Sequence, residues 1–449
     1  MQFKTKLFQH QINAVEKLSK IKVGALYMEQ GTGKTRTALE LIKSRLDKGK
    51  VDSVIWLCPC SVKTNLKKDL GKHCDDISKI YICGIETLSS SIRENVKLLN
   101  KVKNERIYLV VDESNLVKNH QAKRTQNIIR LAEKCQYKVI LNGTPISRCE
   151  KDLFAQWYIL DWRILGYRSF WSFAANHLEY DENIRGKIVR CLETEHLTKK
   201  IAPYTFQVRK SECLDLPKKT YNTLYFDLTA KQYEHYQYVA DNLLFQVDEF
   251  KPYTIYKLLG AVQAVSSGFR LHFDEKDNYA KELFFKNPLQ NPRIECLLDL
   301  IEGISEKCII FCKYTQEITD ILSALSDKAV GYYGDLNQKQ RDENISKFEN
   351  GTQFLVANKQ CAGYGLNLQF CSYIIYYNND WDYATRIQSE DRVHRIGQRD
   401  NVHIVSICAG ETIEERILDC LERKENLIES FKDNIENLKG CLYGEKISK

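Results

Sequence analysis

The sequence predicts an α/β protein built on two open parallel sheets, with helical insertions between them. Short apolar runs alternate with amphipathic stretches in the first third of the chain, and the same alternation returns in the last third. Parallel strands are covered on both faces, so they occur in a sequence as continuous apolar runs separated by helices. A chain of 449 residues is also too long for one ordinary domain, and two or three are expected.

The first sheet is predicted from apolar runs that begin close to the N-terminus. The runs cover residues 22–28, 53–58, 107–111 and 138–143. Between them, two stretches carry apolar side chains at helical spacing, at 36–50 and 125–136. This alternation indicates an N-terminal α/β domain over residues 1–155.

The second sheet is predicted from later runs at 307–312, 329–334, 354–358, 373–379 and 403–408. They indicate a C-terminal α/β domain over residues 291–410. Residues 156–290 are rich in Tyr, Phe and Trp, and we interpret them as helical insertions and an interlobe linker. Residues 411–449 have the pattern of a long amphipathic helix or helix pair that braces one domain.

Composition excludes several classes of protein. The chain has no run of 18 apolar residues and no apolar segment at its start, so we expect no membrane partner, no secretion and a cytoplasmic location. The 16 cysteines form no CxxC pair, which favours buried free thiols over a disulfide framework or a zinc site. The formal net charge of +7 permits a polyanionic partner without requiring one.

A phosphate-binding loop is predicted at "MEQGTGKTRT", between the first apolar run and the first helix. Gly31 and Gly33 allow backbone N–H groups to approach phosphates, Lys34 would reach the β- and γ-phosphates, and Thr35 would hold magnesium. Met28 stands where the strict pattern has its first glycine. The alternative is a simple glycine turn followed by a solvated lysine.

Acidic and polar residues follow the next predicted strands. "YLVVDESN" ends a strand in Asp112 and Glu113, of which the first can hold magnesium through water and the second can orient or deprotonate an attacking water. Thr144 in "LNGTP" ends the next strand and is expected at the same carboxyl edge of the sheet, where ligands bind. Each pattern alone is also common in plain turns.

A basic segment, "SEDRVHRIGQ", lies late in the chain, with Gln388 directly before it. Gln388, Arg392 and Arg395 are spaced at i, i+4 and i+7, so on a helix they would share one face. Taken alone, this face is most simply a charged surface.

The ordered set "EQGTGKT", "DESN", "LNGTP", "GYGLNL" and "SEDRVHRIGQ" resembles the helicase-like ATPases of superfamily two, and most closely their SWI/SNF-type branch. "LFQHQINAVEKL" and "VIWLCPCSVKTNLKKDL" resemble the same branch, so that the resemblance covers nearly the whole chain. It implies two RecA-like (P-loop NTPase) lobes, and ATP and Mg²⁺ as cofactors.

The resemblance also implies roles for individual residues. The catalytic set would be Lys34, Asp112, Glu113, Arg392 and Arg395. ATP would be bound by Gln11, Gly31, Thr32, Gly33, Lys34, Thr35, Gly365 and Gln388. Magnesium would be held by Thr35 and Asp112. The two lobes would be coupled through Asn115, Gly143 and Thr144.

Double-stranded DNA is the partner that the resemblance implies, with branched or single-stranded DNA as further candidates and no protein partner indicated. Its contacts would be made mostly with phosphates, which position a duplex without reading its sequence. The candidates are Ser61, Lys63, Lys118, Lys313, Tyr314, Asn367 and Trp381. For any one lysine, a solvated surface charge explains the sequence equally well.

The chain departs from the family pattern at two places. Asn115 stands where the family usually has His, so we expect hydrolysis to survive with altered coupling between the lobes. The family's "DWNP" is "DWDY" here, which puts the DNA contact of Trp381 in doubt. The short insertions suit a prokaryotic or viral protein, acting in a prokaryotic cell or an infected host cell.

These observations lead to one main hypothesis, a DNA-stimulated ATPase that moves along duplex DNA and remodels DNA or protein–DNA complexes. A strand-separating or annealing helicase in replication, recombination or repair is the alternative within enzymes. A DNA-binding scaffold with an impaired ATPase is the alternative outside them, and it is suggested by Asn115.

Overall fold

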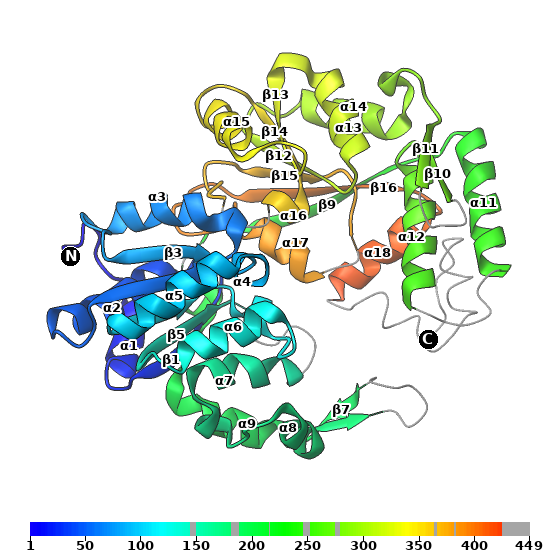
Figure 1. Cartoon of the computed structure of the whole chain (residues 1–449). Helices are drawn as coiled ribbons and strands as arrows, with labels where there is room; N and C mark the ends of the chain where they lie inside the picture. Colours follow the sequence, from blue (N-terminus) through cyan, green and yellow to red (C-terminus); the bar gives the residue numbers. More distant parts are fainter. Residues whose placement is uncertain are drawn as a thin grey trace. The chain divides into compact units, whose positions relative to one another are not determined.

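The computed structural model describes residues 1–143, 150–180, 188–214, 216–245, 252–273, 279–362, 366–380 and 383–423. These residues form two compact units, the first built mainly from residues 1–215 and the second from residue 216 onward. Each unit contains one sheet of six strands (Figure 1). The predicted fold of two α/β lobes is therefore confirmed. Among the described helices, none is both long and apolar enough to cross a membrane.

The first sheet has the strand order β3-β2-β4-β5-β1-β8, and every neighbouring pair is parallel. The four predicted strands are confirmed as β1 (Val23–Met28), β2 (Ser53–Cys58), β4 (Ile107–Val111) and β5 (Tyr137–Asn142). The edge strands β3 (Ile80–Gly84) and β8 (Thr205–Val208) escaped prediction. Both are short and only partly buried. β8 lacks the continuous apolar run of a central strand, whereas the apolar run IYICG of β3 was overlooked.

Helices cover both faces of this sheet because alternate strand residues point to opposite sides. Leu26 and Trp56 pack in one apolar cluster with α1 (Gln9–Leu18), α2 (Lys34–Asp47) and α3 (Lys63–His73). Tyr27 and Leu57 pack on the other face with α5 (Ile92–Asn104), α6 (Lys123–Ala132) and α7 (Lys151–Leu165). The short helix α4 (Thr87–Ser90) lies beside α6.

The aromatic stretch after residue 150 packs in the core of the first unit. Trp157 and Phe173 are fully buried, whereas Trp171 is exposed. This part of the unit comprises α7, α8 (Phe170–His177), the hairpin of β6 (Leu178–Tyr180) and β7 (Ile188–Cys191), α9 (Thr194–Ile201) and α10 (Lys210–Cys213). Most of the buried aromatic side chains of this stretch thus serve packing.

The second sheet has the order β13-β14-β12-β15-β16-β9, again with parallel pairs throughout. The predicted strands are confirmed as β12 (Cys308–Cys312), β13 (Ala329–Tyr332), β14 (Phe354–Asn358), β15 (Tyr373–Tyr376) and β16 (Val402–Ala409). The edge strand β9 (Lys219–Phe226) was missed because most of its side chains are exposed or only partly buried.

Helices pack in two apolar clusters of the second unit. One contains α13 (Pro292–Glu302) and α14 (Thr315–Leu325), and the other contains α11 (Ala230–Phe245), α12 (Pro252–Ser266) and α18 (Ile413–Glu422). The remaining elements are α15 (Gln338–Asn350), α16 (Lys359–Ala362), α17 (Tyr383–Glu390) and the antiparallel pair of β10 (Phe269–Phe273) and β11 (Tyr279–Leu283).

The structure divides the predicted insertion region 156–290 between the two units rather than setting it apart. Each half packs on its own lobe, α7 on the first sheet and α12 beside α18 in the second unit. Of the predicted bracing segment 411–449, α18 is described, and residues 424–449 lie outside the described residues. The described cysteines are free thiols, and most are buried.

A buried ion pair joins three helices of the second unit. Arg293 on α13 is fully buried and pairs with Glu414 on α18. Glu414 also accepts a hydrogen bond from Ser266 Oγ on α12 at 2.5 Å, and Arg293 donates to the backbone oxygen of Tyr377 at 3.0 Å. The two charges therefore compensate each other, which is the condition for burying them, although Arg293 Nε is buried without a hydrogen-bond partner among the described residues.

We expect Glu414→Ala to lower the free energy of unfolding of the second unit by about 3–5 kcal/mol, because it leaves the Arg293 charge buried without its partner. Glu415→Ala changes the next, partly exposed residue and should cost at most about 0.5 kcal/mol. Native-state hydrogen exchange of the β16 amides measures both. Equal protection in the two variants would show that the pair does not stabilise the unit.

Candidate active site

The phosphate loop has the predicted place and conformation, between β1 and α2. Gly31 and Gly33 have φ values of 82° and 87°, in the left-handed region that side chains disfavour. Gly33 is the N-terminal cap of α2. A Cβ atom at this position would also lie 2.0 Å from Gln11 Nε2. The loop therefore requires glycine for both its backbone angles and its packing.

Two residues of α1 hold this loop through hydrogen bonds to its backbone oxygens. Gln11 Nε2 donates to the backbone oxygens of Thr32 at 3.2 Å and Gly33 at 3.3 Å, and its Oε1 accepts from Phe8 N at 2.9 Å. His10 Nε2 donates to the same Thr32 oxygen at 2.8 Å. Gln11, predicted to bind ATP, thus also fixes the shape of the loop. The role of His10 was missed, because only its position beside Gln11 could have indicated it.

Lys34 extends across the mouth of the loop. Its Nζ donates to the backbone oxygens of Met28 at 2.9 Å and Glu29 at 3.4 Å. Thr32 Oγ1 donates to the Glu29 oxygen at 2.7 Å, and Thr35 is partly exposed in the first turn of α2. The start of α2 combines backbone N–H groups with a positive helix end, which is the arrangement that binds phosphate.

The acidic pair follows β4 directly. Asp112 N donates to the Leu57 oxygen on β2, and Glu113 N donates to Asp112 Oδ1 at 2.9 Å. Glu113 has φ 48° and ψ 56°, a left-handed conformation that costs about 1–2 kcal/mol outside glycine. Strain of this kind often occurs at functional sites. The strained backbone of Glu113 therefore supports its assignment to a functional site.

The negative charge of the Asp112–Glu113 pair is only partly compensated by nearby positive charge. Burial first, and then the neighbouring Glu113 carboxylate, raise the pKa of Asp112 to about 6, while the ammonium group of Lys34 acts in the opposite direction. Lys34 is therefore close enough to act on Asp112. A hydroxyl oxygen and carboxylate oxygens with uncompensated negative charge are the donors that Mg²⁺ prefers, so Thr35 and Asp112 fit a magnesium site.

Of the three residues predicted to couple the lobes, Gly143 lies beside the phosphate loop. A Cβ atom on Gly143 would lie 3.4 Å from Gln30 Cγ, so Gly143 adjoins the phosphate loop. Asn115 lies in the 3₁₀ turn η2 (Ser114–Val117), and its Oδ1 is buried without a hydrogen-bond partner among the described residues. Thr144, together with residues 145–149, lies outside them.

The predicted DNA contacts of the first unit differ in their surroundings. Ser61 lies in the 3₁₀ turn η1 (Cys60–Val62), and Lys63 begins α3 with an exposed side chain. Lys118 Nζ lies 3.6 Å from Asp152 Oδ2, so part of its charge is already neutralised. Lys63 is thus the better candidate of the two lysines for a phosphate contact.

Residues 389–398 of the second unit, which we call the arginine segment, do not form the helical face that their spacing predicted. Helix α17 ends at Glu390, and the chain continues in turns. Arg395 N donates to Val393 O at 3.1 Å, a bond that no α-helix contains, and Gly397 has φ 99°. Gln398 holds these turns by donating to the backbone oxygen of Cys371 at 2.6 Å. The prediction of a shared face for Gln388, Arg392 and Arg395 is therefore wrong.

The turns nevertheless bring predicted residues together. Arg395 Nη1 donates to Asn367 Oδ1, and the backbone oxygen of Arg392 accepts from Leu368 N at 2.9 Å. Asn367, predicted to bind nucleic acid, therefore also positions Arg395, and its contact with nucleic acid stays a prediction. Gln388 is partly buried in α17. Gly365 and Trp381 lie outside the described residues.

Glu390 anchors the start of these turns, and its role was missed. Its buried carboxylate accepts from Lys219 Nζ at 2.8 Å, Tyr221 Oη at 2.9 Å and Arg386 Nε at 3.3 Å. The Arg386 guanidinium also lies 4.0 Å from the centre of the Tyr376 ring. Nothing in the local sequence indicated these partners, because Lys219 and Glu390 are 171 positions apart.

The chain that leads into β9 binds the same segment. His394 Nε2, between the two arginines, donates to the backbone oxygen of Pro217 at 2.8 Å. Lys218 N donates to Asn401 Oδ1 at 3.1 Å. Residues 216–221, which we call the linker-end segment, thus hold the arginine segment at several points.

Two predicted DNA contacts of the second unit already have partners inside it. Lys313 Nζ donates to Gln263 Oε1, and Tyr314 Oη donates to the backbone oxygen of Gly260 at 3.0 Å. Both partners lie on α12, and burial lowers the pKa of Lys313. Glu317 accepts from the backbone N–H groups of both residues at 2.9 and 3.0 Å. A role in DNA binding would require these contacts to change.

Comparison with known families identifies two domains in the chain. Residues 77–260 match the SNF2-related domain, and residues 292–397 match the helicase conserved C-terminal domain. The phosphate loop lies before the first match, and Arg392 and Arg395 fall within the second. The order of the two domains agrees with the resemblance inferred from the motifs.

Individual relatives have low sequence identity to this chain but align with most of its length. The chain is 24% identical to an "Uncharacterized ATP-dependent helicase" of Mycoplasma pneumoniae over 90% of its own length and 40% of that protein. It is 23% identical to the "Uncharacterized ATP-dependent helicase YqhH" of Bacillus subtilis, over 96% and 80% of the two chains. The chain spans less than half of the length of the first relatives that it matches.

Among solved structures, the Sulfolobus solfataricus SWI2/SNF2 ATPase core in complex with dsDNA matches at 24% identity and a TM-score of 0.42. The match covers 99% of this chain and 98% of that one.

Proposed function

The chain belongs to the SNF2-related, ATP-dependent helicase-like ATPases, and we propose that it is a DNA-stimulated ATPase that moves along double-stranded DNA. The observation that carries the proposal is the phosphate loop. Gly33, Lys34 and Gln11 form a shaped and braced site, and the Asp112–Glu113 pair follows the strand β4 of the same sheet.

In this proposal each half of the site has its own task. The loop and Lys34 bind the phosphates of ATP, and Thr35 and Asp112 would hold Mg²⁺, which would neutralise phosphate charge. Glu113 orients the attacking water and accepts its proton. Arg392 and Arg395 stabilise the negative charge that develops on the γ-phosphate. The family resemblance implies that ATP is bound between the lobes, so that closure and opening would move one lobe along DNA.

The DNA contacts are proposed mainly with phosphates, from residues such as Ser61 and Lys63, and they should weaken with salt. Gly365, Gln388, Thr144 and Trp381 keep the roles that the family resemblance implies, as proposals. The cytoplasm of a prokaryotic or virus-infected cell is the proposed location, consistent with the two bacterial relatives described above.

ATP turnover measured with duplex, single-stranded and branched DNA and with RNA tests the proposal. We expect duplex DNA to raise kcat, and strand-displacement assays to show no separation of blunt duplexes. Stimulation by RNA alone would contradict the assignment. Strand separation at forks would favour the helicase alternative, and absence of any ATP turnover would favour a scaffold.

Lys219→Met tests whether the linker-end segment positions the arginines. We expect kcat to fall about tenfold, with the KM for ATP unchanged, because a hydrogen bond to a charged group contributes about 1.5–3 kcal/mol. Lys219→Arg should restore most of the rate. Tyr225→Phe, further along the exposed side of β9, is the matched control and should leave kcat as it is. A rise in KM at constant kcat would contradict the positioning role.

A further inference from the structure

The last strand of the second sheet, β9, has one edge that pairs with no described strand. It is parallel to β16 over its whole length, from Lys219 to Phe226. The backbone oxygens of Lys218 and Phe226 accept hydrogen bonds from Val402 and Gly410 at the β16 side. Because backbone groups alternate along a strand, those of residues 219, 221, 223 and 225 point to the other edge.

These outward backbone groups are available in the described part of the chain. No described residue forms a hydrogen bond with the N–H or C=O groups of residues 219, 221, 223 or 225. Proteins commonly protect such an edge with a lysine that points into solvent. Here the edge lysine, Lys219, is turned to Glu390, and its side chain is only 18% exposed. The edge is therefore long, regular and without its usual protection.

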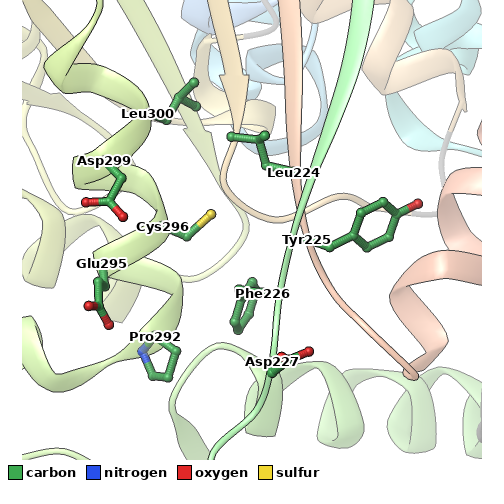
Figure 2. A pocket seen from close by; sticks show the side chains of 9 residues that line it. All are labelled: Leu224, Tyr225, Phe226, Asp227, Pro292, Glu295, Cys296, Asp299 and Leu300. Carbon is green, nitrogen blue, oxygen red and sulfur yellow. The ribbon is translucent and has the colours of Figure 1, made fainter.

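A groove of about 530 Å³ runs between this strand and α13 (Figure 2). Its apolar lining comes from Leu224 and Phe226 on β9 and from Pro292, Cys296 and Leu300 on or beside α13. Figure 2 shows Phe226 and Cys296 lying in the space between the two elements, while Tyr225 points to the opposite side of the strand. The groove can thus receive alternate side chains of an added strand.

Carboxylates surround the edge on both faces of the sheet. Asp227, Glu295 and Asp299 line the groove. On the other face, burial first, and then Cys408 and the carboxylates of α18, raise the pKa of Tyr225. The α18 residues concerned are Glu415, Asp419 and Glu422. Arg416 lies 3.3 Å from Asp419 and offsets one of these charges. A site with this balance repels phosphate groups and attracts cationic side chains.

We propose that the free edge of β9 is a docking site for an extended, lysine- or arginine-rich segment of a partner protein, which adds to the sheet as a further strand. Backbone hydrogen bonds to residues 219–225 would supply affinity, and the acidic groove would select basic over acidic segments. A second copy of this chain fits less well, because two acidic edges would repel each other. The inference does not depend on the proposed ATPase function.

The test uses the full chain and a fluorescein-labelled octapeptide, acetyl-KVKTKVKT-amide, with fluorescence anisotropy as the readout. We expect saturable binding that weakens with salt, and no binding of the matching glutamate peptide. Hydrogen exchange should show new protection at residues 221, 223 and 225. Equal binding of the acidic peptide would overturn the proposal.

Variants separate the edge from the rest of the surface. Thr223→Pro removes one outward N–H group and leaves the β16 ladder intact, so it should weaken binding at least tenfold, whereas Thr223→Ala should not. Glu295→Lys combined with Asp299→Lys should weaken it similarly, with Glu349→Lys, at an exposed position on α15, as the control. ATP turnover and the melting temperature should not change. Unchanged peptide binding in Thr223→Pro, or self-association that this variant abolishes, would overturn the proposal.

Discussion

Replacing Arg395 or Arg392 with Ala should lower kcat for ATP hydrolysis by about 10³–10⁵-fold, the range found for arginines that act on a transferring phosphoryl group. ATP binding should stay within about threefold of the wild-type protein, because the phosphate loop, Lys34 and Gln11 are unaffected. Single-turnover kinetics and binding of a fluorescent ATP analogue measure the two quantities separately. The arginine whose loss costs more is the one closer to the γ-phosphate.

Arg399→Ala is the matched control for both variants, since Arg399 belongs to the same stretch of chain and is exposed. It should keep kcat within about twofold, as surface substitutions usually do. Asn367→Ala removes the hydrogen-bond acceptor of Arg395 and should lower kcat by less than Arg395→Ala does. If the two arginine variants lost ATP binding together with kcat, the arginines would be binding residues in the ground state.

Glu113→Gln should lower kcat by about 10²–10⁴-fold, the usual contribution of a general base. The amide keeps the size of the side chain and the backbone contact with Asp112 Oδ1, so Mg²⁺-dependent ATP binding should remain. Glu133→Gln, at an exposed position after α6, is the control. A Glu113→Gln variant that still turned over ATP at more than a third of the wild-type rate would remove Glu113 from the catalytic set.

Most of the fold was predictable because the central strands are buried on both faces. The runs at 53–58 and 308–312 are entirely buried in the structure, so their composition carried a strong signal. The edge strands β8 and β9 face solvent in part, and no long apolar run marked them, whereas the short apolar run of β3 was overlooked. Whether a strand could be predicted from the sequence therefore depended more on its burial than on its strand propensity.

The phosphate loop was equally predictable, because its glycines and lysine act through local backbone geometry. Contacts between distant segments were not. The ties of Glu390 to Lys219 and Tyr221, and of His394 to Pro217, join residues far apart in the sequence. The spacing of Gln388, Arg392 and Arg395 even suggested a helix, whereas buried Val393 and Gln398 belong to turns that follow α17. Tertiary contacts override local periodicity at such places.

Displacement of a third strand from a DNA triplex tests the central claim most directly, because only a protein that moves along the duplex removes it. With ATP, the wild-type protein should displace the third strand, and the rate should fall with increasing salt. Glu113→Gln and Arg395→Ala should bind the same DNA without displacing it. If duplex DNA stimulated ATP turnover while the third strand stayed in place, the protein would be a DNA-dependent ATPase that does not translocate, which would contradict this account.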